Sequence, residues 1–97
     1  MVVIDIYIIL TYDISVDENG AKVLRNTFKT CKKYLHHVQF SVFEGEISPS
    51  QFMSLSIELK KWIRPECDSV IIFQTREEKW LKKNFIGRRE DATTNIL

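Results

Sequence analysis

Several ingredients of common enzyme classes are missing from this sequence of 97 residues. It has only two cysteines, Cys31 and Cys67, and they lack the spacing of a zinc site. In a reducing compartment we expect both to be free, small, buried or half-buried side chains. A glycine-rich phosphate loop and the spacing of a serine or cysteine triad are also absent. The sequence therefore does not indicate a phosphate-loop enzyme, a zinc protein or a triad hydrolase.

Long hydrophobic runs are absent too. The longest apolar run, residues 6–10, is far shorter than the roughly 20 residues that span a bilayer, and no signal-type pattern opens the chain. We expect a cytoplasmic protein with no membrane contact. The 44% hydrophobic content and eleven aromatic residues are typical of a folded protein, and the length is that of one domain, residues 1–97.

Acidic residues are missing from one long stretch, residues 19–43. The net charge is only +1, so the total alone indicates no polyanionic partner. The distribution is more informative, because five basic residues fall in that acid-free stretch: Lys22, Arg25, Lys29, Lys32 and Lys33.

Hydrophobic spacing predicts the order of elements. Residues 4–13 are β-branched and almost continuously apolar, which is typical of a central strand. A helix follows over residues 21–35, and its start is left open between a capping box at 15–18, an Asp17 cap and Asn19-Gly20. The spacing predicts that the buried face of this helix carries Leu24, Phe28, Cys31 and Leu35.

The second half repeats the strand and helix signals. Residues 36–47 are read as two short strands or one bulged strand. Ser48 caps a second helix, with Pro49 at its first position and Gln51 at its third, and Arg64-Pro65 ends it. The buried face of this helix is expected to carry Phe52, Leu55, Leu59 and Trp62 or Ile63. Residues 69–74 form a last short strand.

The order strand, helix, strand pair, helix, strand predicts an α+β fold, a ferredoxin-like βαββαβ sandwich with two helices on one face of an antiparallel sheet. The other face of that sheet is left uncovered. Isoleucines on both sides of the first strand suggest that a second copy covers it, so we predict a homodimer.

Asp13 closes the first strand and is the main candidate for chemistry. An aspartate at a strand end is first of all a turn-maker. In a homodimer, however, two Asp13 carboxylates about 5 Å apart would repel by roughly 3 kcal/mol at an effective dielectric constant of 20. Either one stays protonated or a divalent cation such as Mg²⁺ lies between them, and a bound water could then attack phosphorus.

The other candidates have simpler readings. Tyr12 alternates to the opposite side of the strand and is expected in the core or an interface. His36 and His37 are adjacent, so on a strand they face opposite ways and cannot chelate one metal. Glu44 and Glu46 could join a metal shell but are more simply rim carboxylates of an edge strand. Both tryptophans, at 62 and 80, are read as core or interface side chains.

The basic residues of the first helix recur at three- and four-residue spacing, so they form one exposed face. We call Lys22, Arg25, Lys29, Lys32 and Lys33 the basic ridge. In a single chain it is simply a solvated helix face. Doubled by a twofold axis, it would suit nucleic-acid phosphates and duplex shape without reading sequence.

Several stretches of the chain resemble one known family. "YDIS", "LRNTFKTCKKYLHHVQFSVFEGEISPSQF", "ELKKWI", "DSVIIF" and "TTNIL" resemble the small CRISPR-associated protein 2 family, from about Tyr7 to Leu97. The stretch "VQ-x-SVFEGE" followed by a Ser-Pro-capped helix is the most specific part.

The resemblance implies a ferredoxin-like homodimer whose Asp13 side chains face one another across the interface. It also implies a magnesium-dependent endonuclease on RNA or DNA, and a place at the centre of the complex that inserts new spacers. In that complex the dimer would bridge two dimers of the CRISPR integrase and hold a duplex on its basic surface. Residues 75–97 would act in dimerisation and partner contact, with the end at Asn95-Ile96-Leu97 adding a strand to the partner's sheet.

Two departures from the family pattern bear on hydrolysis more than on binding. Some members carry arginines soon after the first strand and one before the Val-Gln pair. Here the first basic residue after Asp13 is Lys22, and His37 stands at the later position; residues 1–6 also precede the usual start. Two functions therefore stay open: an enzyme with metal at Asp13, supported by Tyr12, His37 or Phe43, and a non-catalytic scaffold that holds duplex on the basic ridge.

Overall fold

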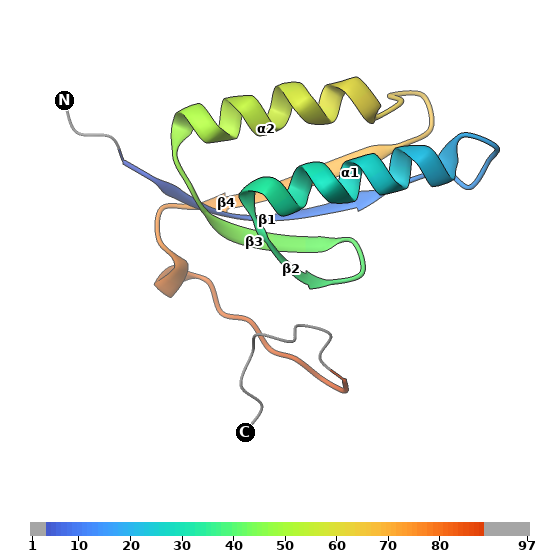
Figure 1. Ribbon diagram of the computed structural model, residues 1–97. Coiled ribbons are helices and arrows are strands. Elements are labelled where there is room, and N and C mark those ends of the chain that lie inside the picture. The colour runs from blue at the N-terminus through green and yellow to red at the C-terminus, as the bar shows by residue number, and fades with distance from the viewer. Residues whose placement is uncertain (1–3, 89–97) are drawn as a thin grey trace.

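The computed structural model describes residues 4–88, and all structural statements below refer to that part of the chain. Strands and helices follow one another in the predicted order (Figure 1). They are β1 (Ile6–Asp13), α1 (Gly20–Tyr34), β2 (His36–Gln39), β3 (Val42–Ile47), α2 (Pro49–Trp62), β4 (Ser69–Thr75) and the short 3-10 helix η1 (Glu78–Trp80).

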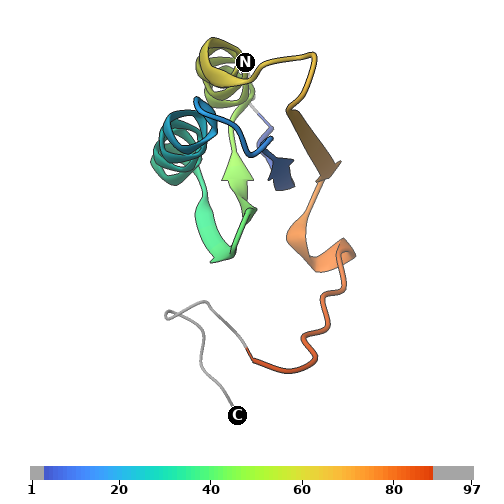
Figure 2. The same cartoon turned by 90° about the vertical axis from the view of Figure 1, so that its right-hand side faces the viewer.

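The strands form one antiparallel sheet in the order β2-β3-β1-β4. Both helices lie on the same face of this sheet, as Figures 1 and 2 show from two directions. This is the predicted ferredoxin-like α+β arrangement, with β1 in the interior of the sheet between β3 and β4. The predicted fold class is confirmed.

The core lies between the sheet and the two helices. From β1 it takes Ile8, Leu10 and Tyr12, which alternate with residues facing the other side. Phe43 and Ile47 of β3 complete the strand side of this core. Ile6 packs against the same core. The face away from the helices, here called the outer face, receives the alternate residues of β1, which are Tyr7, Ile9, Thr11 and Asp13.

Helix α2 begins as the sequence predicts. Ser48 precedes it, its hydroxyl accepts from the Gln51 backbone N–H at 3.2 Å, and the Gln51 side chain accepts from the Ser48 N–H at 3.0 Å. With Pro49 in the first position, this is a complete capping box. The predicted buried face is also confirmed, because Leu55 and Leu59 are buried and Phe52 and Ile63 pack against the core.

The start of α1 differs from the capping box considered for residues 15–18. The helix begins at Gly20, and Ser15 instead donates its hydroxyl to the Cys67 carbonyl at 3.0 Å. Asp17 accepts from the Asn19 N–H at 3.0 Å in an Asx-type turn before the helix. Gly20 suits this tight entry because a Cβ there would lie 2.3 Å from the Ser15 carbonyl oxygen.

The buried face of α1 also differs in part. Cys31 and Leu35 are buried as predicted and Phe28 is half-buried, but Leu24 is 47% exposed. The structure buries Val23, Thr27 and Thr30 in its place. Four-residue spacing alone predicts that Leu24 faces inward, but the helix is rotated so that this position lies beside the core rather than over it.

Residues 36–47 form two strands, the first of the two alternatives considered. The connection is only Phe40-Ser41, and the pairing of β2 with β3 shifts between His37 and Gln39. Phe40 has a φ of 40°, a left-handed value that residues other than glycine seldom adopt.

Two further expectations concern cysteines and membranes. Both cysteines are free, and Cys31 is buried as expected, but the expectation that Cys67 is buried or half-buried is wrong, because its side chain in the loop before β4 is exposed. Neither helix in residues 4–88 is long and apolar enough to cross a membrane. The expected strand exchange by the C-terminal end falls in residues 89–97, outside the described part of the chain.

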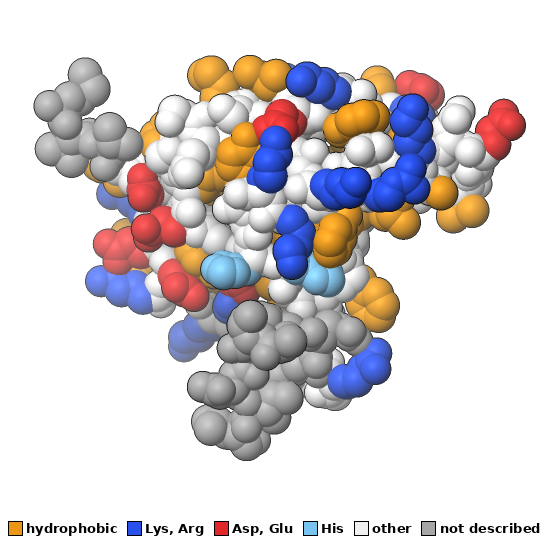
Figure 3. All heavy atoms as spheres, viewed as in Figure 1, with side chains coloured by type: hydrophobic (Ala, Val, Ile, Leu, Met, Phe, Trp, Pro, Cys, Tyr) orange, Lys and Arg blue, Asp and Glu red, His pale blue; other side chains and the backbone are white. Residues whose placement is uncertain are grey.

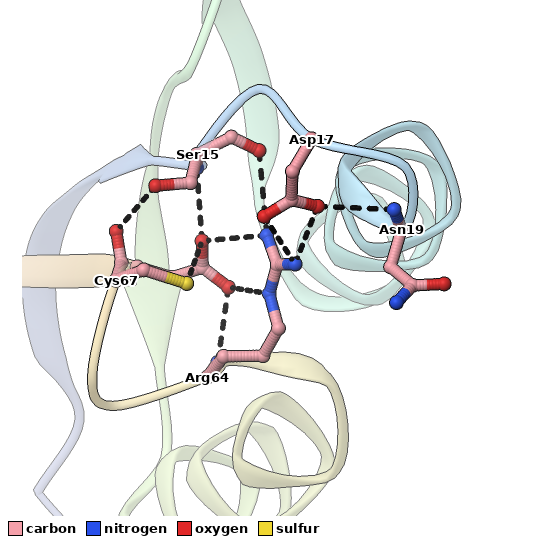
Figure 4. A network of polar contacts seen from close by, with 6 residues as sticks. Ser15, Asp17, Asn19, Arg64 and Cys67 are labelled. Atoms are coloured by element: carbon pink, nitrogen blue, oxygen red, sulfur yellow. Dashed lines mark hydrogen bonds and ion pairs between the residues drawn. The ribbon is translucent and has the colours of Figure 1, made fainter.

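Arg64 links the loop after β1 to the loop before β4 (Figure 4). Its guanidinium donates to both oxygens of Asp17, at 2.7 and 2.9 Å, and to both oxygens of Asp68, at 2.8 and 3.0 Å. Asp68 also accepts from the Ser15 backbone N–H at 2.9 Å. The buried Asp68 carboxylate is thus balanced by one cation and by backbone donors, and the two loops are held together beside the end of β1.

The Arg64 guanidinium and these backbone donors hold the pKa of Asp68 well below its usual range. A pKa that is lower in the folded state stabilises the protein above the usual aspartate value, about 4, and the stabilisation is lost as the pH falls below it. We therefore expect Asp68→Asn to be less stable than the native protein at pH 7. The difference in unfolding free energy should shrink as the pH falls from about 5 toward 2.

Urea denaturation at several pH values measures this difference, with Glu66→Gln as an exposed control in the same loop. A stability difference that is the same at every pH would contradict the assignment of the Asp68 charge to this network.

Candidate functional site

Asp13 is the last residue of β1 and lies opposite Ser69 of β4 in the sheet register. Because Tyr12 points into the core, Asp13 points to the outer face. It is exposed, and within residues 4–88 its carboxylate makes no hydrogen bond or ion pair. Two residues later the chain enters the Arg64 network, so the backbone beyond this carboxylate is held in place.

The outer face around β4 is apolar. Ile71 is 51% exposed and Phe73 is 59% exposed. They pair with Thr11 and Ile9 of β1, which places the exposed side chains on the same side of the sheet as Asp13. Large apolar surface of this kind is a feature of interfaces.

The segment after β4, residues 76–88, runs along the outer face, on the side away from the helices (Figure 1). It is attached there through Glu44, whose carboxylate accepts from the Tyr7 hydroxyl and from the Lys83 ammonium group. Burial, together with the hydrogen bond to Glu44, raises the pKa of Tyr7 well above its usual value, so this hydroxyl stays protonated.

The position of Glu44 corrects one sequence reading. We read Glu44 and Glu46 as rim carboxylates of an edge strand, but β3 is an interior strand between β2 and β1. Glu46 is exposed, whereas Glu44 is only 7% exposed and is balanced by Lys83. A buried carboxylate of this kind needs a cation, which the sequence supplies from a residue 39 positions away.

A metal site is not assembled within residues 4–88, where no three histidine, cysteine, aspartate or glutamate side chains gather closely enough to hold an ion. His36 is exposed and His37 is half-buried, on opposite sides of β2 as expected. Asp13 is therefore the metal-ligand candidate that this part of the chain offers at the end of β1, with one carboxylate per chain.

The three residues expected to support Asp13 lie in an aromatic cluster beneath the β2–β3 turn. His37 lies 4.9 Å from both the Phe28 and the Phe43 ring centroids, and Phe43 lies 6.1 Å from Tyr12. Phe43 is completely buried, so His37 lies between it and the surface. Burial raises the pKa of Tyr12 to about 12. The cluster shapes the core next to Asp13, and His37 and Phe28 are its half-buried members.

The basic ridge lies on the exposed face of α1, and all five of its residues are exposed. Figure 3 shows basic side chains gathered over this helix with hydrophobic side chains among them. Lys33 pairs with Glu58 of α2. The other four make no ion pair with any carboxylate in residues 4–88; they are Lys22, Arg25, Lys29 and Lys32.

The sequence does not predict the contacts of Arg64 and Lys83, the two cations that fix the loops and the segment near Asp13. Arg64 is predicted only to end α2, and the sequence includes Lys83 among further basic residues after residue 75 that could follow a nucleic-acid backbone; the structure instead pairs Lys83 with Glu44. The buried Glu44 carboxylate implies a cationic partner, but spacing along the chain cannot identify Lys83, which is 39 residues away. Asp68 lies only four residues after Arg64, whereas the link from Arg64 to Asp17 spans 47 residues and leaves no mark in the spacing. Phe40 falls within residues 36–47, which are predicted as strand, and no sequence pattern marks its left-handed conformation.

Comparison with known proteins agrees with the geometry. Residues 6–83 match the family described as CRISPR associated protein Cas2. A protein of Fusobacterium nucleatum subsp. nucleatum named CRISPR-associated endoribonuclease Cas2 is 48% identical over 91 residues, covering 94% of this chain and 86% of that protein.

Two solved structures have the same fold. One, described as Cas2, is 30% identical with a TM-score of 0.79 and covers 96% of this chain and 99% of its own. The other, Cas2 of Streptococcus pyogenes, is 28% identical with a TM-score of 0.75 and covers 84% of this chain and 99% of its own. With a family match over most of its length and a relative of this similarity, the chain belongs to the Cas2 family of CRISPR-associated proteins.

Proposed function

We propose that the chain acts in CRISPR adaptation as a homodimer in which two Asp13 carboxylates share a divalent cation and hydrolyse phosphodiester bonds of RNA or DNA. The observation that carries this proposal is the exposed, unpaired Asp13 at the end of an interior strand, on the apolar outer face. The curated relatives named endoribonucleases support hydrolysis as the reaction.

The homodimer is supported by the outer face itself. Ile71 and Phe73 expose apolar surface there, and Ile86 in the segment beyond is 97% exposed. A hollow of about 370 Å³ lies between the sheet and that segment, lined in part by Ile9, Val42 and Ile86. A second copy seated on this face would bury these side chains and bring two strand ends, each with its Asp13, toward one another.

The metal requirement follows from the ligand count. Magnesium is commonly held by one or two carboxylates together with waters and substrate phosphates, and the two Asp13 carboxylates of a dimer would supply such a set. When bound, such a cation supplies an activated water and neutralises charge on the phosphate. The carboxylate of Asp13 would hold it, and the Arg64 network keeps the following loop from shifting.

A second function, a non-catalytic scaffold, is favoured by the unpaired cations of α1. Because four of the five ridge residues make no ion pair in residues 4–88, their charge is available to nucleic-acid phosphates. In this function the dimer holds duplex DNA by its backbone and bridges dimers of the CRISPR integrase during spacer acquisition. Asp13 is then a structural strand-end residue, and hydrolysis is dispensable.

Substitution of Asp13 tests hydrolysis. Asp13→Asn keeps the size of the side chain and removes its charge, so we expect cleavage of RNA and DNA in the presence of Mg²⁺ to fall to the level seen without metal. Glu18→Gln is the control, because Glu18 is an exposed carboxylate in the loop after β1 and lies outside the Arg64 network. Nuclease assays with and without Mg²⁺ measure the rates. Cleavage that persists in Asp13→Asn would exclude Asp13 as the metal ligand.

The second prediction tests the basic ridge. If about six phosphates are neutralised, the logarithm of the duplex association constant should fall against that of salt concentration with a slope near −5. Changing both Lys22 and Lys32 to glutamine should weaken binding and make the slope less negative by about 2. Changing Lys60 and Lys61 of α2 to glutamine removes the same charge elsewhere and should change neither. A slope that is flat for the native protein would exclude the ridge as the binding surface.

The third prediction tests the dimer. Phe73→Glu places a charge in the apolar outer face, so we expect the dimer to dissociate into monomers of half the mass. Met53→Glu is the matched control, because Met53 is 64% exposed on α2, on the helix side of the molecule. Sedimentation analysis distinguishes the two species. A native protein that is monomeric at all concentrations would contradict the shared Asp13 site.

A further inference from the structure

A groove lies between α1 and the β2–β3 turn, on the helix side of the sheet and away from the outer face. Its walls are mostly apolar: Tyr12, Leu24, Phe28 and Phe40 contribute rings and an aliphatic side chain. Its volume of about 730 Å³ falls within the range of small-molecule binding sites, roughly 300–1,000 Å³. The proposed dimer face does not use this surface, and Tyr12 is the one lining residue that is also a candidate supporting residue of Asp13.

Phe40 gives this groove an unusual wall. Its side chain is 73% exposed, and its backbone has the left-handed φ of 40°. Two-residue hairpin turns normally place glycine, asparagine or aspartate at such a position. Exposure of the aromatic ring to water and the left-handed backbone both cost free energy. Backbone strain of this kind often marks a functional position.

The side chain of His37 fixes the backbone of the β2–β3 turn. His37 donates from Nε2 to the Phe40 carbonyl oxygen, 2.7 Å away, since a carbonyl can only accept. The imidazole is in turn packed at 4.9 Å against both the Phe28 and the Phe43 rings. The orientation of the Phe40 backbone is therefore set by the core, while most of its ring is exposed.

Charge at the groove has one sign. Arg25 and Lys29, one helical turn apart on α1, line the groove together with its aromatic wall. Neither forms an ion pair with a carboxylate in residues 4–88. A ligand that suits this groove has a flat apolar part beside one or more negative charges.

We propose that the groove binds an unpaired nucleotide, with its base stacked on Phe40 and its phosphate at Arg25 or Lys29. Aromatic side chains beside cations are the usual means of binding single-stranded nucleic acid without sequence preference. The inference rests on the proposed binding of phosphates along α1, and it adds a second substrate feature, an unpaired base at or near a duplex end.

A protein partner with an acidic, apolar segment would meet the same chemistry. The nucleotide is favoured because Arg25 and Lys29 belong both to the groove and to the basic ridge. A nucleic-acid strand whose phosphates contact the basic ridge can therefore reach the Phe40 ring, because Arg25 and Lys29 line the same groove. Bases inside a duplex have both faces stacked, so they cannot offer a face to this ring, whereas an unpaired base can.

The test compares three fluorescent DNA probes with the full chain: a blunt duplex, the same duplex with a short unpaired tail, and the same tail made of abasic nucleotides. The two tailed probes carry equal phosphate charge, so a difference between them reports the bases alone. We expect the native protein to bind the tail with bases about tenfold more tightly than the abasic tail.

Two variants of Phe40 locate the effect. Phe40→Asn removes the ring while suiting the left-handed backbone, so it should fold normally, keep its affinity for the blunt duplex and lose the difference between the tails. Phe40→Trp keeps an aromatic face and should retain that difference. Circular dichroism and thermal unfolding confirm that both variants are folded.

The outcomes separate this inference from the function on which it rests. If the native protein binds blunt duplex in a salt-dependent way but does not distinguish the tails, the nucleotide proposal is wrong while the ridge proposal stands, and the groove is left for a protein partner. If Phe40→Asn keeps the preference for bases, the proposal is also wrong. If the native protein binds no duplex at all, the proposed function fails, and this inference fails with it.

Discussion

Burial of a single face of β1 is the constraint on which the rest of this structure depends. Ile8, Leu10 and Tyr12 must be covered by both helices, and strand geometry then turns every alternate residue to the other side of the sheet. Asp13 is therefore held on the outer face by the same packing that buries Tyr12. A shift of β1 by one residue would exchange the two sets and place the carboxylate in the core.

Charge balance divides the ionisable side chains into two groups. The buried carboxylates of Asp68 and Glu44 are compensated inside the chain, by Arg64 and Lys83. In contrast, Asp13 and four residues of the basic ridge have no ion pair within residues 4–88. Compensated charges hold loops and segments together, whereas uncompensated charges are available to external partners such as a cation or a phosphate.

The two proposed functions use opposite sides of one molecule. The outer face carries Asp13 and the apolar surface of Phe73, while the helix side carries the basic ridge and the groove at Phe40. A dimer formed through the outer face would leave both ridges exposed. Hydrolysis and duplex binding are therefore compatible in one assembly, and neither depends on residues that the other must bury.

The sequence by itself determined the order of elements, the interior place of β1, the capping of α2 by Ser48 and the exposed charge of α1, because these follow from local periodicity and turn chemistry. The family was also readable from the stretch around "SVFEGE". Only the tertiary structure decided that Leu24 faces the surface, that Arg64 joins Asp17 to Asp68, that Lys83 balances Glu44 and that Phe40 is held in a left-handed turn. Each of these depends on contacts between residues distant in the chain or on the exact rotation of a helix, and neither is encoded in spacing alone.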